Sequence, residues 1–219
     1  MNSIYCISGF GADERVFSKL TFAGYSFQFI PWIDPFKNET IESYAERMSK
    51  EIKEDDPVIL GLSFGGIMSI EIAKIKKVRQ IILISSVKTH HELPLWMRLS
   101  GKLVLDKLLP LKSFALIEPI ENYNLGLENE EEVQLVHEYR KNISQQYTNW
   151  ATPEIINWRN DWIAPNIFHI HGGKDHIFPI KNIKADYVIE DGGHFMIMNR
   201  ATEMNKILKK ILNERVRKN

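Results

Sequence analysis

Gly61-Leu62-Ser63-Phe64-Gly65-Gly66 is the stretch of this sequence that decides its fold. It is a G-x-S-x-G motif between an apolar run, Val58 to Leu62, and a segment with helical spacing. A serine at such a strand-to-helix turn adopts a strained backbone geometry, so the residues two positions before and after it need very small side chains. Gly61 and Gly65 meet this need. The N-terminus of the following helix directs backbone N–H groups, first that of Phe64, at any oxyanion formed beside the serine.

Apolar runs rich in Ile, Val and Tyr recur on both sides of this motif and predict six buried strands. They are Ile4 to Ile7, Tyr25 to Ile33, Val58 to Leu62, Gln80 to Ser85, Ile167 to His171 and Ala185 to Ile189. Helix-like stretches separate the first four runs, at Asp13 to Leu20, Thr40 to Ile52 and Phe64 to Lys76. This alternation predicts the α/β class, with a mostly parallel sheet of about six strands and helices on both faces.

The alternation stops after Ser86 and resumes near Asn166, which predicts a helical insertion. We expect a core of residues 1–87 and 163–219 and an insertion of residues 88–162. One helix of the insertion is predicted by the three- and four-residue spacing of Val136, Tyr139, Ile143, Tyr147 and Trp150. A second is predicted through Trp96, Leu99, Leu103, Leu108 and Leu109, ending near Pro110, and a third from Pro153 to Trp158. The core is expected to end with a helix from Thr202 to Val216.

A serine hydroxyl is a weak nucleophile at neutral pH, so it needs a base and a group that holds the base in one tautomer. His194 follows the last predicted strand in Gly192-Gly193-His194, and Asp175 follows the strand before it. We therefore predict Ser63 as nucleophile, His194 as general base and Asp175 as the orienting acid. Asp161 and Asp191 remain alternatives for the acid.

The order Ser, Asp, His resembles that of the α/β-hydrolase superfamily, and the resemblance extends over nearly the whole chain. It includes His171 to Pro179, an H-G-x-x-D-x-x-x-P stretch, and Ser8-Gly9-Phe10-Gly11, which is similar to the family's oxyanion loop. Ser8 and Leu62 stand where many members have histidine. The resemblance implies the α/β-hydrolase fold, an oxyanion hole formed by the N–H groups of Phe10 and Phe64, and an insertion that acts as a lid.

The predicted function is that of a serine hydrolase that cleaves a small, mostly apolar carboxylic ester through an acyl-enzyme on Ser63, without a cofactor. A thioesterase or a C–C bond hydrolase with the same triad is an alternative, because the fold does not determine the substrate. A non-catalytic ligand sensor of the same fold is another. Trp96, Met97 and Trp150 of the insertion are predicted to line the substrate pocket.

Composition bears on partners. The 28 Lys and Arg residues balance 28 Asp and Glu residues, so no net charge favours nucleic acid or an anionic membrane. The absence of a long apolar run predicts a cytoplasmic protein without a membrane partner. The single cysteine, Cys6, lies in an apolar run and is expected to be a buried strand residue. The oligomeric state stays open.

Histidines near Asp175 suggest a metal site, but their pattern argues against one. His169 and His171 share one face of a predicted strand, and no third ligand has convincing spacing. His90, His91 and His137 are interpreted as solvated or capping residues. The sequence therefore predicts no bound metal.

Overall fold

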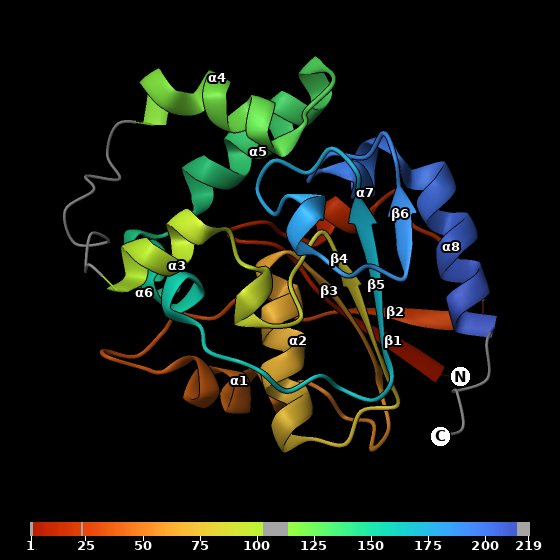
Figure 1. The fold of residues 1–219 in the computed structure, drawn as a ribbon. Coiled ribbons are helices and arrows are strands. Elements are labelled where there is room, and N and C mark those ends of the chain that lie inside the picture. Colours follow the sequence, from red (N-terminus) through yellow and green to blue (C-terminus); the bar gives the residue numbers. More distant parts are fainter. Residues whose placement is uncertain (1, 23, 103–113, 214–219) are drawn as a thin grey trace.

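The computed structural model describes residues 2–22, 24–102 and 114–213, which form one six-stranded sheet covered by helices (Figure 1). The strands are β1 (Asn2–Ile7), β2 (Tyr25–Phe29), β3 (Val58–Leu62), β4 (Gln80–Ile84), β5 (Ile167–Gly172) and β6 (Tyr187–Ile189). They lie in the order β2-β1-β3-β4-β5-β6, and every neighbouring pair is parallel. The predicted α/β class and six-stranded sheet are confirmed.

Alternate residues of the central strands face two different hydrophobic cores. In the register of the sheet Cys6 lies beside Leu60 and Leu60 beside Ile82, and all three belong to one core. Their neighbours Ile59 and Ile81 pair with each other and belong to the other core. All five residues of β3 and of β4 are buried. A strand buried on both faces reads as a continuous apolar run, which explains the strong sequence signal.

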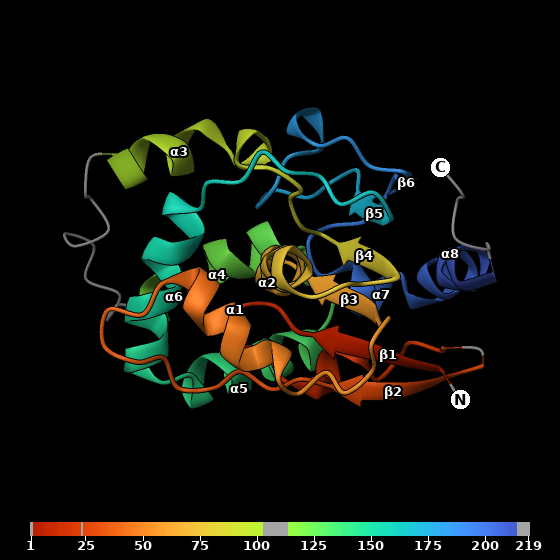
Figure 2. The same ribbon diagram turned by 90° about the horizontal axis from the view of Figure 1, so that it is seen from below.

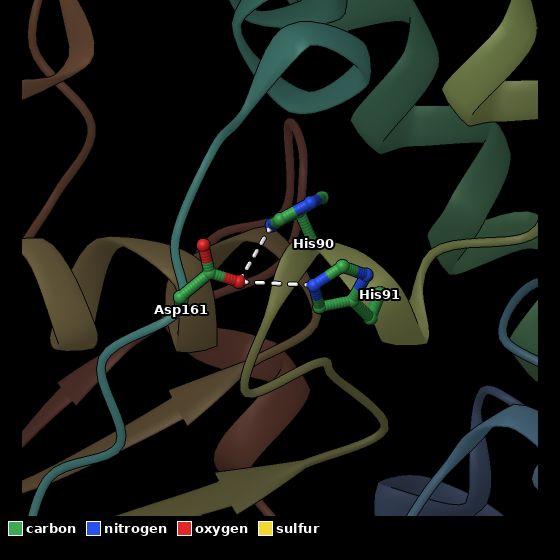
Figure 3. A group of neighbouring side chains, drawn as sticks. All are labelled: His90, His91 and Asp161. Carbon is green, nitrogen blue, oxygen red and sulfur yellow. Dashed lines mark ion pairs between the residues drawn. The ribbon is translucent and has the colours of Figure 1, made fainter.

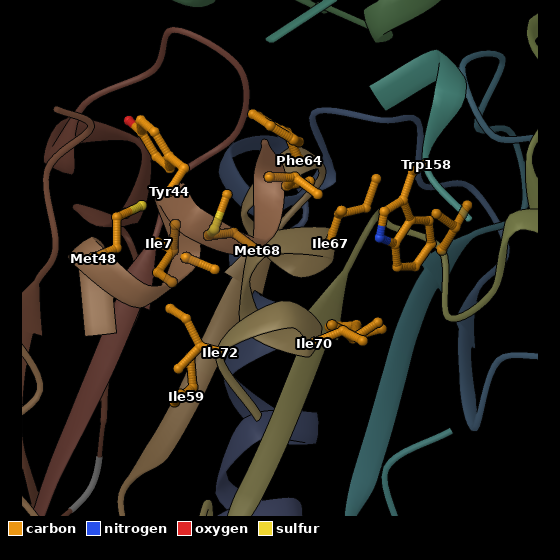
Figure 4. Packing of buried hydrophobic residues seen from close by; sticks show 14 of the residues in the cluster. Ile7, Tyr44, Met48, Ile59, Phe64, Ile67, Met68, Ile70, Ile72 and Trp158 are labelled. Carbon is orange, nitrogen blue, oxygen red and sulfur yellow. The ribbon is translucent and has the colours of Figure 1, made fainter. Parts of the chain in front are cut away.

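Helices cover both faces of the sheet. α1 (Ile41–Ser49) and α2 (Phe64–Ile75) contribute to one core, and α8 (Ala201–Asn213) contributes to the other. Figure 4 shows the first of these cores, in which α1 and α2 bury the side chains of Tyr44, Met48, Ile67, Met68, Ile70 and Ile72. Each such burial stabilises the fold by about 1.5–3 kcal/mol. No helix in the described part of the chain is long and apolar enough to cross a bilayer.

In the described part of the chain, four α-helices lie between β4 and β5: α3 (Leu95–Lys102), α4 (Phe114–Leu125), α5 (Glu130–Asn142) and α6 (Gln145–Asn157). α4 and α5 lie beyond the carboxyl ends of the strands in Figure 1, and α6 lies beside α1 in Figure 2. Two indole N–H groups fasten this segment to the core. Trp150 donates to the carbonyl of Glu39 at 2.8 Å, and Trp158 donates to the buried carboxylate of Glu71 at 2.6 Å.

The prediction of a single helix from Val136 to Trp150 is wrong, because α5 ends at Asn142 and α6 begins at Gln145. The Ser144 side chain accepts a hydrogen bond from the N–H of Tyr147 at 3.1 Å and caps a new helix, α6. Both helices have an apolar face, so the three- and four-residue spacing continues from α5 into α6. The two faces are buried in different cores. Pro153 also lies inside α6 rather than at the start of a third helix.

Other predicted boundaries shift. The strand expected to reach Ile33 ends at Phe29, before Pro31, which has no N–H to donate to a ladder. The helix expected from Asp13 to Leu20 is a short 3-10 turn, η1 (Glu14–Phe17). α3 contains Trp96 and Leu99, but Leu103, Leu108, Leu109 and Pro110 lie outside the described residues. The last helix begins at Ala201, and its predicted end at Val216 also lies outside them.

Candidate active site

Ser63 occupies the turn between β3 and α2 in a backbone conformation that few residues other than glycine adopt. Its φ is 51° and its ψ is −117°, away from the main allowed regions. The Ser63 N–H donates to the carbonyl of Ile84 at 2.9 Å, and the Ser86 hydroxyl donates to the carbonyl of Ser63 at 2.7 Å. These bonds hold the strained turn in place at the carboxyl end of β3.

Two glycines let the backbone segments around this turn approach one another closely. A Cβ at Gly65 would overlap the backbone oxygens of Ile7 and Ser8, at the end of β1. A Cβ at Gly61 would overlap the backbone of α2. Any larger residue at these positions would push strand and helix apart, which is the physical reason for the G-x-S-x-G spacing.

The structure brings together Ser63, His194 and Asp175, which follow three different strands. The Nε2 atom of His194 lies 3.0 Å from the Oγ of Ser63, and its Nδ1 lies 2.8 Å from Oδ2 of Asp175. His194 and Asp175 are 7% and 3% exposed, so water competes little for these hydrogen bonds. The geometry is that of a nucleophile, a base and a group that orients the base.

Asp175 is held as a carboxylate on the far side of His194. Its Oδ1 accepts hydrogen bonds from the N–H groups of Ile177 and Phe178, both at 2.8 Å. Burial opposes ionisation of Asp175, but the charge and hydrogen bond of His194, with smaller contributions from His171 and Phe178, outweigh it and lower the pKa below its ordinary value. An ionised Asp175 keeps the proton of His194 on Nδ1 and leaves the Nε2 lone pair directed at Ser63.

A pair of histidines, His169 and His171, lies behind this triad and is fully buried in β5. His171 Nε2 lies 2.8 Å from the carbonyl of Phe178, and His171 Nδ1 lies 3.2 Å from His169 Nε2. A carbonyl can only accept, so His171 carries its proton on Nε2 and its Nδ1 accepts from His169. His171 thus fixes the loop that carries Phe178 and the Asp175 hydrogen bonds. Sequence reasoning placed His169 and His171 on one face of a strand but did not identify the hydrogen bond between them.

This pair makes the stability of the protein depend on pH. Burial, as the leading cause, lowers the pKa of both histidines below their ordinary value, so below about pH 6.5 the unfolded chain binds protons that the folded chain does not. The contribution of these two histidines to the free energy of unfolding should be fully present above about pH 6.5. Below that pH the free energy of unfolding should fall, by up to about 1.4 kcal/mol per pH unit for each histidine.

Urea unfolding at pH values between about 7.5 and 5.5 measures this slope. His169→Phe should remove about half of the histidine-dependent slope, whatever its effect on stability at neutral pH. His176→Gln, a change at an exposed histidine, should leave the slope unchanged. An identical slope in wild type and His169→Phe would contradict the assignment.

The loop after β1 lies directly beside Ser63. A Cβ at Gly9 would be 3.4 Å from the Cβ of Ser63, and a turn closed by the N–H of Ala12 on the carbonyl of Gly9 contains Phe10. Trp32 fixes the loop: its indole N–H lies 3.0 Å from both the Ser8 hydroxyl and the Gly9 carbonyl. The predicted oxyanion donor Phe10 is therefore in the loop next to Ser63.

Phe64, the other predicted donor, begins α2, where the first N–H groups have no intrahelical partner. Its ring stacks on the indole of Trp32 with centroids 5.0 Å apart and an interplanar angle of 8°. The two predicted donors are thereby held on one rigid frame. Sequence reasoning missed Trp32, because nothing in the sequence links a tryptophan after β2 to the turn after β1.

A cavity of about 400 Å³ opens onto Ser63 and His194, within the range of small-molecule sites. Residues of α3, α4, α5 and α6 contribute to its lining. Its apolar side chains include Val16, Leu62, Ile67, Met97, Leu125, Val136, Ile143, Ile155, Ile177 and Phe178. The cavity therefore favours an apolar ligand group close to Ser63.

Of the three predicted pocket residues, only Met97 lines this cavity. The prediction for Trp96 and Trp150 is wrong. Trp96 is 61% exposed, because it lies on the side of α3 that faces away from the core. Trp150 is buried and stacks on Tyr44 with centroids 4.0 Å apart, so it joins α6 to α1.

One part of the cavity lining is polar. Glu121, Asn124 and Arg140 lie there. Arg140 forms ion pairs with Glu118 at 3.0 Å and Glu121 at 3.2 Å. Two carboxylates therefore face the Arg140 guanidinium, so this arginine offers no uncompensated positive charge to an anionic substrate.

The alternative acids lie in other surroundings. Asp191 forms an ion pair with Lys174 at 2.5 Å, and Asp161 lies beside His90 and His91. Asp175 is the acid that contacts His194 Nδ1.

No protein-family model matches this chain, and no curated protein matches it either. Among solved structures, an esterase from Exiguobacterium antarcticum is similar with a TM-score of 0.76 and 16% identity, over 98% of this chain and 92% of that chain. The N-acyl homoserine lactonase AidH, complexed with N-butanoyl homoserine, has a TM-score of 0.72 and 15% identity, over 100% and 91%. A thermophilic esterase from Thermogutta terrifontis has a TM-score of 0.67 and 15% identity, over 99% and 91%.

Proposed function

The chain has the α/β-hydrolase fold, and from this premise we propose that it is a serine hydrolase that cleaves a small, mostly apolar carboxylic ester through an acyl-enzyme on Ser63. The observation that carries the proposal is the chain of hydrogen bonds from Ser63 through His194 to Asp175, with distances of 3.0 and 2.8 Å. It lies beside a largely apolar cavity. Fold alone would not support an activity, because this fold serves many functions.

In the proposed reaction the Ser63 oxygen attacks the ester carbonyl while Nε2 of His194 takes its proton. The ionised Asp175 stabilises the imidazolium. The oxyanion receives hydrogen bonds from the N–H groups of Phe64 and Phe10, and each such donor contributes up to about 4 kcal/mol to the transition state. His194 then protonates the leaving alcohol. Water, deprotonated by His194, cleaves the acyl-enzyme and regenerates Ser63.

The helical insertion, residues 88–162, is proposed to act as the lid that shapes the substrate site. Residues of α3, α4, α5 and α6 line the cavity together with Ser63 and Leu62. The apolar lining suits an acyl or alkyl chain. The paired charges around Arg140 favour neutral substrates over carboxylates, because an added anion would meet two glutamates.

Turnover of several acyl compounds distinguishes the substrate classes. The test is labelling of the wild type with a fluorophosphonate, together with hydrolysis of p-nitrophenyl esters of increasing chain length. Matched thioesters and an N-acyl homoserine lactone, the ligand class of one structural neighbour, complete the set. Labelling with multiple-turnover ester hydrolysis supports the proposal. A folded protein that is not labelled, or that releases one equivalent of product and stops, contradicts it and favours a ligand sensor.

The cavity predicts which variants change chain-length preference. Ile155→Trp places a larger side chain on the α6 part of the lining, so the optimal acyl chain should become shorter by several carbons and long esters should lose most of their kcat/KM. Ile120→Trp is the matched control, because Ile120 lies on α4, is 63% exposed and does not line the cavity. An unchanged chain-length profile in a folded Ile155→Trp would place the acyl chain elsewhere.

A further inference from the structure

The two ends of the helical insertion are joined at one point, outside the cavity. The N–H of His90 donates to the carbonyl of Asn160 at 3.0 Å. The Asn160 side chain, which is 4% exposed, donates to the carbonyls of Lys88 at 2.8 Å and Trp162 at 2.7 Å. The segment before α3 and the segment after α6 therefore run side by side with fixed backbones.

Three potentially metal-binding side chains, two histidines and one aspartate, converge at this junction (Figure 3). Asp161 Oδ1 lies 3.3 Å from His90 Nδ1 and 3.0 Å from His91 Nε2. One potential ligand atom from each of the three residues lies within 4.8 Å of those of the other two. None of the three residues lines the cavity at Ser63, so the cluster is separate from the proposed active site.

We propose that His90, His91 and Asp161 bind a divalent late transition metal ion, with Zn²⁺ as the representative ion. Zinc–nitrogen and zinc–oxygen bonds of about 2.0–2.2 Å place tetrahedral ligand atoms about 3.4 Å apart. The two observed separations from Asp161 differ from this by a few tenths of an ångström, so small side chain rotations suffice. Water completes the coordination on the exposed side.

The surroundings determine which atoms must rearrange. His90 Nδ1 also lies 3.1 Å from the carbonyl of Asn160; to bind the metal it loses that hydrogen bond and carries its proton on Nε2 instead. Glu92 is not a fourth ligand, because its carboxylate accepts from the N–H groups of Lys88 and Lys184. The Arg98 guanidinium reaches the His91 carbonyl at 3.4 Å and is a nearby positive charge that opposes a cation.

The ligand types set the selectivity. Two imidazoles and one carboxylate suit Zn²⁺, Ni²⁺ and Cu²⁺, whereas Mg²⁺ and Ca²⁺ require mostly oxygen ligands. The bound ion would link residues at the two ends of the insertion, 90–91 and 161. Because the unfolded chain does not hold these residues together, binding should stabilise the folded protein in proportion to the logarithm of the metal concentration above Kd.

The experiment is isothermal titration of the full-length, tag-free protein with Zn²⁺, and in parallel with Mg²⁺, after chelator treatment. We expect one Zn²⁺ per chain, no comparable binding of Mg²⁺, and a Tm that rises with Zn²⁺. His91→Ala and Asp161→Asn change exposed residues and should each weaken binding at least about 10-fold, since even outer-shell changes cost that much.

His137→Ala is the matched control, because His137 is an exposed histidine that faces a single carboxylate, Glu118, at 3.1 Å. It should leave the Zn²⁺ affinity unchanged. The proposal is overturned if the wild type binds no Zn²⁺, or if His91→Ala and Asp161→Asn bind it as tightly as the wild type. Either result would leave the proposed hydrolase activity untouched, because the cluster and the triad share no residue.

Discussion

Ser63→Ala should lower kcat/KM for the best ester by roughly 10⁴- to 10⁶-fold and abolish fluorophosphonate labelling, while the protein stays folded. The reason is that the substitution removes only the nucleophilic oxygen. The hydrogen bonds of the turn use the Ser63 N–H and carbonyl, which alanine retains. Residual hydrolysis above the rate in water should persist, because the oxyanion donors and the cavity remain.

Ser69→Ala is the matched control for this prediction. Ser69 is a fully buried serine of α2 whose hydroxyl donates to the Gly65 carbonyl at 2.7 Å, so it tests the loss of a nearby hydroxyl that is not aimed at substrate. Its kcat/KM should stay within a few-fold of the wild type. Near-normal activity and labelling in Ser63→Ala, with a native Tm, would remove Ser63 from the proposed mechanism.

The triad positions could be predicted because local sequence determines each of them. Gly65 is required by its close contact with the backbone at the end of β1, and Gly61 by its close contact with the backbone of α2. The need for these two glycines appears directly in the sequence as a motif. Asp175 follows the buried strand β5, and His194 follows the short, partly exposed strand β6, and both strands are apolar runs in the sequence. Since the carboxyl ends of parallel strands meet at one edge of a sheet, their convergence on Ser63 follows from the topology.

The insertion was harder to predict because its helices bury two different faces. A three- and four-residue spacing that runs from Val136 to Trp150 does not reveal that Ser144 starts a new helix. The same limit explains the pocket. An aromatic residue in an insertion can face substrate, solvent or another helix, and spacing alone did not separate Met97 from the exposed Trp96 or the buried Trp150.

Contacts between distant segments leave no local trace in the sequence. Trp32 holds the loop at Gly9, 23 residues away in the chain, but it belongs to no motif. The cluster at the ends of the insertion is of the same kind. His90 and His91 gain Asp161 as a neighbour only because Asn160 joins two segments that are separated by the whole insertion.

Asp175→Asn should lower kcat/KM by about 10⁴-fold, the loss expected when the base is held in the wrong tautomer. Asparagine can still accept the hydrogen bonds from Ile177 and Phe178 through its carbonyl oxygen. Its amide NH₂ would then face His194 Nδ1, which must accept rather than donate. The proton of His194 then moves to Nε2, and this nitrogen can no longer take the proton of Ser63.

Asp191→Asn distinguishes this mechanism from a general effect of removing a carboxylate near the site. Asp191 lies two residues after β6 and three before His194, but its side chain is exposed and pairs with Lys174. Its loss should change kcat/KM by no more than a few-fold, because an exposed ion pair contributes little and the Asp191 carboxylate does not contact His194. Ester hydrolysis and the rate of fluorophosphonate labelling, measured for both variants, decide the assignment. If Asp191→Asn were the inactive variant and Asp175→Asn retained activity, the acid would be Asp191 and the His194 hydrogen bond to Asp175 would have only a structural role.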